Sequence, residues 1–97
     1  MNVVKLTGTL VAREAVRYTP AGIEVFDGLF HHRSQVTHAG VERRVEFDFP
    51  AVTYGEAAGR LNAAELGTEM TLKGYFAPRS NKSQRLIVHI TEYISRS

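Results

Sequence analysis

Apolar and polar residues alternate along most of this 97-residue chain, and a period of two is typical of half-buried β-strands. The pattern is clearest in residues 2–11, where Val4, Leu6 and Leu10 share one face of the predicted strand. Gly8 lies inside this segment. A glycine within a strand favours a bulge or a sharp bend, and a barrel needs such a bend to curl its first strand across both halves of a sheet.

Four further strands are predicted. The tetrapeptide at residues 19–22, Thr-Pro-Ala-Gly, suits a type I turn, so a second strand is expected to begin at residue 23 and to run to about residue 35. Residues 36–42 have no periodicity and predict a mobile loop, which leads into a third strand at residues 43–52. Two more strands flank a polar, basic hairpin tip at residues 78–84. The apolar faces of the last three strands are expected to contact the core through Phe47, Phe49, Met70, Leu72, Phe76, Leu86, Val88, Ile90 and Ile94.

Residues 54–66 carry the only helical spacing in the chain, and Gly67 offers a C-terminal stop. A helix of about three turns is long enough to plug one end of a barrel. The predicted order is therefore three strands, one helix and two strands. This is the order of the OB-fold, an all-β, five-stranded Greek-key barrel with one short helix between strands three and four. A chain of 97 residues has room for one core, so we expect a single OB-fold domain over residues 1–97.

The composition argues against several classes of function. The chain has no cysteine, so disulfides and thiolate chemistry are excluded. His31 and His32 are adjacent on a strand and point to opposite faces, so they cannot share a metal ion. Because no glycine-rich phosphate loop or nucleophile motif is present either, we expect no enzyme, no metal and no cofactor. No segment reaches the ~20 apolar residues that span a bilayer and no secretion signal is evident, which makes the cytoplasm the expected compartment.

Charge is distributed unevenly along the chain. Residues 1–69 carry seven Lys or Arg and nine Asp or Glu, whereas residues 70–97 carry five Lys or Arg and one Glu. Two interpretations stay open: a basic surface for an anionic partner, or a hairpin tip whose cations only keep it soluble. The strongest concentration is at residues 79–85, which contain no acidic residue, so we expect the charge there to be uncompensated on Arg79, Lys82 and Arg85.

Two stretches resemble the N-terminal half of bacterial single-stranded DNA-binding proteins. They are residues 3–10, Val-Val-Lys-Leu-Thr-Gly-Thr-Leu, and residues 16–23, Val-Arg-Tyr-Thr-Pro-Ala-Gly-Ile. The chain is more similar still to the primosomal replication protein N (PriB) family, whose short members end soon after the fifth strand. In that comparison the segments that fall in register are His32-Arg33-Ser34, Arg43 with Phe49-Pro50, and the glycines Gly55, Gly67 and Gly74.

This resemblance implies a homodimer of OB-folds that binds single-stranded DNA. It also implies a role in assembling the replication restart primosome with a helicase and other primosomal proteins. It places the first strand near the dimer interface, at Lys5, Leu6 and Gly8. A dimer also suits a small domain without disulfides or metal, because the interface adds buried surface.

One position departs from the family's pattern. Glu46 stands where that pattern has a tryptophan for base stacking. A carboxylate repels phosphate and does not stack on a base, so we expect the third strand to contribute less to binding than it does in relatives. Two alternatives stay open: a protein-interaction OB module with weak or no DNA binding, which Glu46 favours, and an RNA-binding OB domain.

Binding of a single strand needs basic side chains along the phosphate backbone and aromatic rings on which bases stack. Tyr75, on the same strand face as Lys73, is the expected stacking residue. The nucleic-acid-binding residues that we expect are Arg17, Arg33, Arg44, Lys73, Tyr75, Arg79, Lys82 and Arg85.

Overall fold

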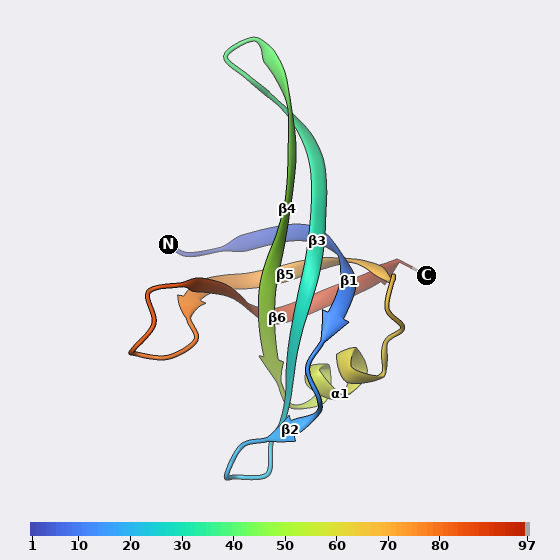
Figure 1. The fold of residues 1–97 in the computed structure, drawn as a ribbon, viewed down its shortest axis with the longest axis vertical. Coiled ribbons are helices and arrows are strands. Elements are labelled where there is room, and N and C mark those ends of the chain that lie inside the picture. Colours follow the sequence, from blue (N-terminus) through green and yellow to red (C-terminus); the bar gives the residue numbers. More distant parts are fainter. Residues whose placement is uncertain (97) are drawn as a thin grey trace.

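A computed structural model describes residues 1–96 and contains five long strands, one helix and one two-residue strand (Figure 1). The helix follows the third long strand, as predicted from the sequence. In chain order the elements are β1 (Val4–Arg13), β2 (Arg17–Tyr18), β3 (Glu24–His38), β4 (Val41–Tyr54), α1 (Glu56–Ala63), β5 (Glu69–Pro78) and β6 (Leu86–Arg96).

The long strands close into a barrel because β1 pairs on both of its edges. Its residues 4–9 pair antiparallel with β5, and its residues 9–13 pair antiparallel with β3. The order around the barrel is β1, β3, β4, β6, β5 and back to β1, with β4 and β6 parallel. This arrangement is the OB-fold. Gly8 lies just before Thr9, the residue at which β1 pairs with both β5 and β3, and a Cβ there would come within 3.1 Å of Phe30 and Phe49. The irregularity in the register of β1 lies between Leu10 and Ala12, beyond the glycine at which the sequence predicted a bulge or bend.

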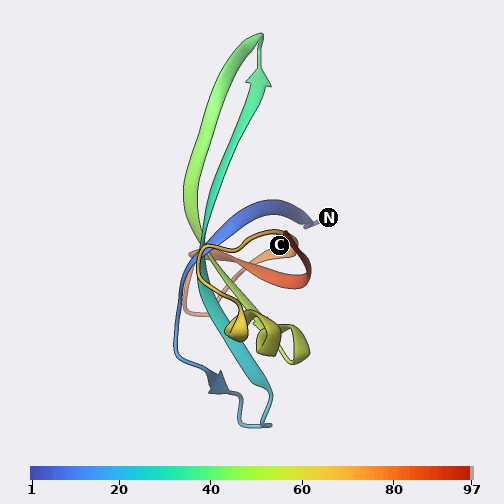
Figure 2. The same ribbon diagram turned by 90° about the vertical axis from the view of Figure 1, so that its right-hand side faces the viewer.

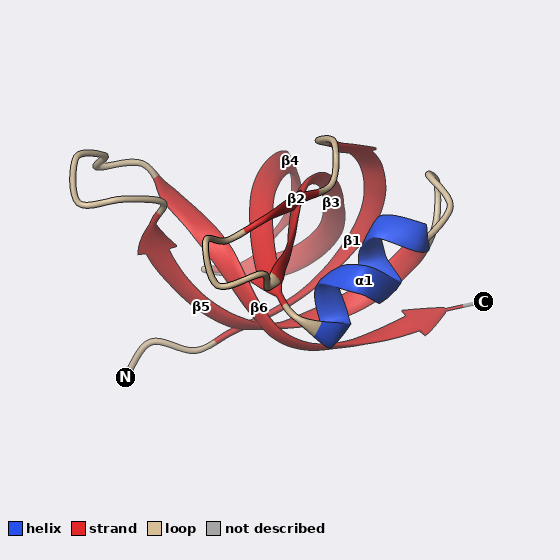
Figure 3. Ribbon diagram, turned by 90° about the horizontal axis from the view of Figure 1, so that it is seen from below, coloured by secondary structure: helices blue, strands red, loops and turns tan. Residues whose placement is uncertain are grey.

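Phenylalanine rings from β3 and β4 fill the centre of the barrel. Phe30 stacks on Phe49 with ring centroids 5.6 Å apart, and its other neighbour Phe26 meets it edge-on at 6.1 Å. The helix α1 covers the end of the barrel that faces the viewer in Figure 3 and buries Ala58 and Leu61. It has eight residues, fewer than predicted, because the backbone becomes extended directly after Ala63.

The strands β3 and β4 form a long arm that projects beyond the barrel (Figures 1 and 2). Their pairing continues to His38 and Val41, so the mobile loop predicted at residues 36–42 is wrong. Ala39 and Gly40 make a two-residue turn with positive φ angles of 53° and 75°, the geometry that joins two strands tightly. The arm does not pack on the barrel core. Its sequence therefore shows no alternation of buried and exposed residues.

Two phenylalanines expected in the core lie at the surface. Phe47 is 41% exposed because it stands on the arm, above the part of the sheet that closes the barrel. Phe76 is 40% exposed because it lies beyond Val4, where β1 begins to pair with β5. Leu86, at the first position of β6, is exposed for a similar reason.

A bulge overturns the expectation for Ile94. The register of β5 and β6 shifts by one residue after Lys73, which leaves Thr91 unpaired. The extra residue reverses which side chains face the barrel, so Tyr93 packs against the core and Ile94 is exposed. Gly74 lies opposite the bulge, where a Cβ would come within 1.9 Å of a backbone oxygen of β6, so only glycine fits.

Candidate nucleic-acid interface

The outward side chains of β3 and β4 form one continuous surface, which we call the outer β3–β4 face. The register pairs Leu29 with Pro50 and His31 with Asp48, and strand alternation turns these four side chains away from the phenylalanine core. From the α1 end toward the arm, the face consists of Asp27, Leu29 with Pro50, His31 with Asp48, Arg33 with Glu46, and Arg44.

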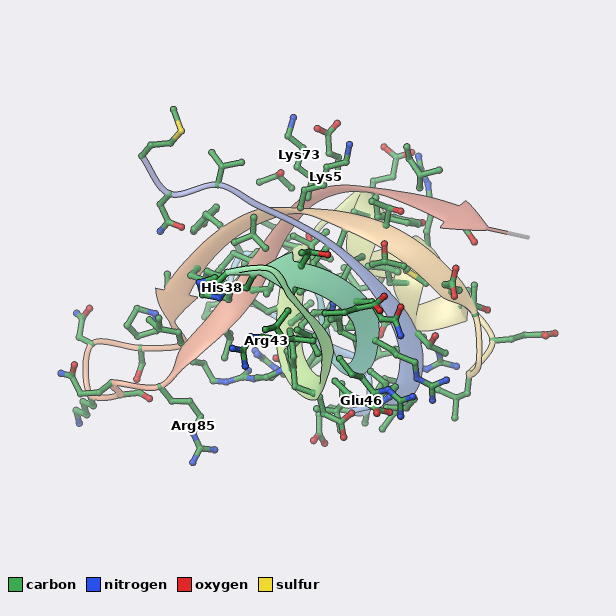
Figure 4. The ribbon with its side chains drawn as sticks, turned by 90° about the horizontal axis from the view of Figure 1, so that it is seen from above. Lys5, His38, Arg43, Glu46, Lys73 and Arg85 are labelled. Atoms are coloured by element: carbon green, nitrogen blue, oxygen red, sulfur yellow. The ribbon has the colours of Figure 1, made fainter. Side chains whose placement is uncertain are left out.

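The hairpin tip between β5 and β6, residues 79–85, which we call the basic loop, adjoins one end of this face. Together with Pro50 and Ile87 the loop lines an open groove of about 580 Å³. Within the described residues 1–96, Lys82 and Arg85 form no ion pair. Arg85 points away from the barrel into solvent (Figure 4).

Arg79 differs from the other two cations of the loop, because its guanidinium bonds to Asp27. Arg79 Nη1 donates to Asp27 Oδ1, while Arg17 donates to Asp27 Oδ2 from Nη2 at 2.7 Å and from Nε at 3.1 Å. The expectation that the whole loop is uncompensated is therefore wrong for Arg79. Burial would raise the pKa of Asp27, but the hydrogen bonds from Arg79 and Arg17 outweigh it and hold that pKa below its usual value.

In the middle of the outer β3–β4 face, His31 lies between two carboxylates. Its Nδ1 is 2.6 Å from Asp48 Oδ1, and its Nε2 is 2.9 Å from Glu46 Oε2. The hydrogen bonds to Asp48 and then to Glu46 raise the pKa of His31, and the bond from His31 lowers the pKa of Glu46. When His31 is protonated, its charge and that of Arg33, whose Nη2 is 3.4 Å from Glu46 Oε2, offset both negative charges. In that state phosphate would meet less repulsion here than Glu46 alone suggests.

His32 points to the opposite face, as predicted from strand alternation. It is buried, and its Nδ1 lies 2.7 Å from the backbone oxygen of Thr7. Its Nε2 lies 2.8 Å from Ser34 Oγ. Within residues 1–96, no cluster of three or more His, Cys, Asp or Glu side chains has the geometry to hold a metal ion. No helix of that part of the chain is long and apolar enough to cross a membrane.

Tyr75 lies on β5, four residues before the cation that starts the basic loop, and offers an exposed aromatic ring. It is 41% exposed, and it stacks on His89 with ring centroids 4.9 Å apart and an angle of 6° between the rings. The sequence did not reveal His89 as its neighbour. Because the stack on His89 already restricts the Tyr75 side chain, stacking of a base on Tyr75 costs little additional conformational entropy.

Lys73 does not join the other predicted binding residues. It pairs across the strands with Lys5 and lies 3.3 Å from Glu92. Figure 4 shows Lys5 and Lys73 on one side of the barrel and Arg85 and Glu46 on the other. The structure thus groups Arg17 with Arg79, beside the loop cations, and groups Arg33 with Arg44 at the base of the arm, where both line one groove.

The sequence of this chain matches one family model and is similar to several known proteins. Residues 2–92 match a family model described as another single-strand binding protein family. The chain is 37% identical to replication restart protein PriB of Bordetella pertussis over 92 residues, which cover 95% of this chain and 86% of the relative. It is 31% identical to replication restart protein PriB of Nitrosomonas europaea over 91 residues, 94% of this chain and 84% of the relative.

Solved structures show the same similarity in three dimensions. PriB from Ralstonia solanacearum superposes with a TM-score of 0.88 at 34% identity, covering 100% of this chain and 99% of the other. The single-stranded DNA binding protein of Thermus aquaticus superposes with a TM-score of 0.79 at 24% identity, covering all of this chain and 50% of that protein. The second likeness concerns the fold alone.

Proposed function

We propose that this chain, which belongs to the replication restart protein PriB family, binds single-stranded DNA in the cytoplasm as an accessory protein of replication restart. The proposal includes a homodimer and a primosomal helicase as protein partner. We also propose that the protein acts by binding and catalyses no reaction.

The observation that carries the proposal is a set of cations without acidic partners at both ends of the outer β3–β4 face. Lys82 and Arg85 lie at the loop end and Arg44 at the arm end, and none of them forms an ion pair within residues 1–96. From Asp27 to Arg33 the face extends over six residue-to-residue steps of β3, about 20 Å. Phosphates can bind the cations at both ends, while Tyr75 offers a ring for a base without reading its identity.

Titration of the protein with labelled oligomers tests this proposal. We expect single-stranded DNA to bind more tightly than a duplex of the same sequence, because only unpaired bases can stack on an exposed ring. Tighter binding of an RNA oligomer would instead support an RNA-binding OB domain. Absence of binding to every oligomer at low salt would support the protein-interaction module, which the carboxylates Glu46 and Asp48 on the same face favour.

The homodimer is proposed on the free edge of the first strand. Residues 4–8 of β1 pair with β5 and not with β3, so the edge beside Lys5 can pair with the same segment of a second copy, while the Thr7 oxygen is already bonded to His32. Lys5 is exposed there, Leu6 is half-buried and Gly8 is buried. Light scattering at micromolar concentration is expected to give twice the chain mass of 10.8 kDa. A mass of 10.8 kDa alone would contradict the dimer.

The proposed protein partners are the primosomal helicase and other primosome proteins. Support comes from the relatives, which are named for replication restart. Co-sedimentation of the purified protein with a replication restart helicase, with and without single-stranded DNA, tests the pairing. We expect a complex in at least one of the two conditions, and two independent sedimenting species in both would contradict it.

A further inference from the structure

The side chain of Asp27 connects two separate segments to the barrel wall. It stands on β3 and is 8% exposed, beneath the guanidinium groups of Arg17 and Arg79. Arg17 belongs to the two-residue strand β2, and Arg79 begins the basic loop. One buried carboxylate therefore holds residues that lie 10 and 52 positions away along the chain.

The bond from Arg79 to Asp27 joins the basic loop to the barrel. Inside the loop, the amide of Ser83 donates to the Ser80 oxygen at 3.1 Å, and the amide of Arg85 donates to Ser83 Oγ at 3.1 Å. Within the described part of the chain, residues 1–96, no hydrogen bond other than that of Arg79 to Asp27 joins the loop to the barrel. Without it, the loop would be free to move on its two strand ends.

We propose that Asp27 is a positioning residue for nucleic-acid binding: it fixes the basic loop and Arg17 in one arrangement and so raises the affinity for single-stranded DNA, although its own charge opposes phosphate. This inference rests on the proposed function. Both arginine side chains remain about half exposed, so they can bind phosphate while they are bonded to Asp27. The lowered pKa of Asp27 keeps the carboxylate ionised at neutral pH.

Asp27 affects the affinity for single-stranded DNA in two ways, through its charge and through the order that it gives to the loop. The two effects have opposite signs, so a substitution can distinguish them. A carboxylate that acts only through its charge weakens the binding of phosphate, and removing it would increase the affinity. A carboxylate that orders a loop before binding removes an ordering penalty, which amounts to about two- to tenfold in affinity for each long side chain. Replacing Asp27 thus raises the affinity under the first effect and lowers it under the second.

Asp27→Asn removes the charge and keeps the size of the side chain, and Asp48→Asn is the matched control on the same face. Asp48 carries the same charge but holds no part of the basic loop. We expect Asp27→Asn to bind single-stranded DNA about three- to tenfold more weakly than the parent. We expect Asp48→Asn to bind equally well or up to about threefold more tightly, the size of one unscreened charge about 7 Å away. Tighter binding by Asp27→Asn would overturn the inference.

Hydrogen exchange without DNA tests the same inference independently of the function. The amides of Ser83 and Arg85 should lose protection in Asp27→Asn, while amides of the barrel core should keep theirs. If that variant does not fold, Arg79→Gln breaks the same ion pair from its exposed side, and the same loss is expected at Ser83. Unchanged protection would overturn the inference. A parent protein that binds no DNA would refute the proposed function instead, and exchange would still decide whether Asp27 anchors the loop.

Discussion

Replacing Arg79, Lys82 and Arg85 together by alanine is expected to weaken binding of single-stranded DNA by about two orders of magnitude at about 50 mM salt, and to flatten its salt dependence by about two units of slope. Each phosphate neutralised on a single strand contributes about 0.7 to that slope, and the three cations would contact three phosphates. The fold should survive, because a hairpin tip carries little of the core. Fluorescence anisotropy across a salt series measures both quantities.

The three cations differ in whether an acidic side chain is bonded to them. Arg79 is already bonded to Asp27, whereas Lys82 and Arg85 have no acidic partner within residues 1–96. At about 0.7 for each cation, the double variant of Lys82 and Arg85 should account for about 1.4 of the two units, and Arg79, which is paired, for at most the remainder. Arg60→Ala is the control, because Arg60 is paired with Glu56 and belongs to α1, which lies away from the basic loop (Figure 1). A triple variant with the affinity and slope of the parent would place the site elsewhere, along Arg17, Arg33 and Arg44.

Tyr75→Ala is expected to cost about 1–3 kcal/mol of binding free energy, the usual effect of removing a ring on which a base stacks. The ring carries no charge, so the salt slope should stay within experimental error of the parent. A lower affinity together with an unchanged salt slope would show that Tyr75 contributes by stacking and not by contact with phosphate. Titrations of the parent and the variant at two or more salt concentrations measure both properties.

Tyr75→Phe is the matched control for this prediction. It keeps the ring and its stack on His89 but removes the hydroxyl, so it should bind like the parent. If Tyr75→Ala bound as tightly as the parent, another ring would have to accept the base. Phe47 would then be the next candidate, since it is exposed on the arm and its inner side packs on His32 with centroids 5.0 Å apart.

The architecture could be predicted from local patterns because each long strand is buried on one side over much of its length. Alternation at Val4, Leu6 and Leu10, the turn at residues 19–22 and the helical spacing before Gly67 were enough to give the order of the elements and the OB-fold. The turn is present, with the Gly22 amide donating to the Thr19 oxygen at 2.8 Å. The arm was missed because alternation reports burial, and most of residues 36–42 are paired without being buried.

The candidate site was predictable in its residue types but not in its contacts. Strand alternation could have placed Asp27, His31 and Arg33 on one face, but the neighbours of that face depend on register. Register in turn follows from the turn at Ala39 and Gly40, whose position the local sequence did not reveal. The contact of Asp27 with Arg79 spans 52 residues and joins strands that are not consecutive, which no local pattern encodes.

The salt dependence of the parent protein's affinity for a single-stranded DNA oligomer is the most direct test of the proposed function. We expect a linear fall of log affinity with log salt, with a slope between about −2 and −4. A slope of about −2 corresponds to about three phosphate contacts, from Lys82, Arg85 and Arg44. A slope of about −4 corresponds to about six contacts, if the paired arginines Arg17, Arg33 and Arg79 also bind phosphate. Negligible affinity at low salt, or an affinity that does not change with salt, would contradict single-strand binding by these cations.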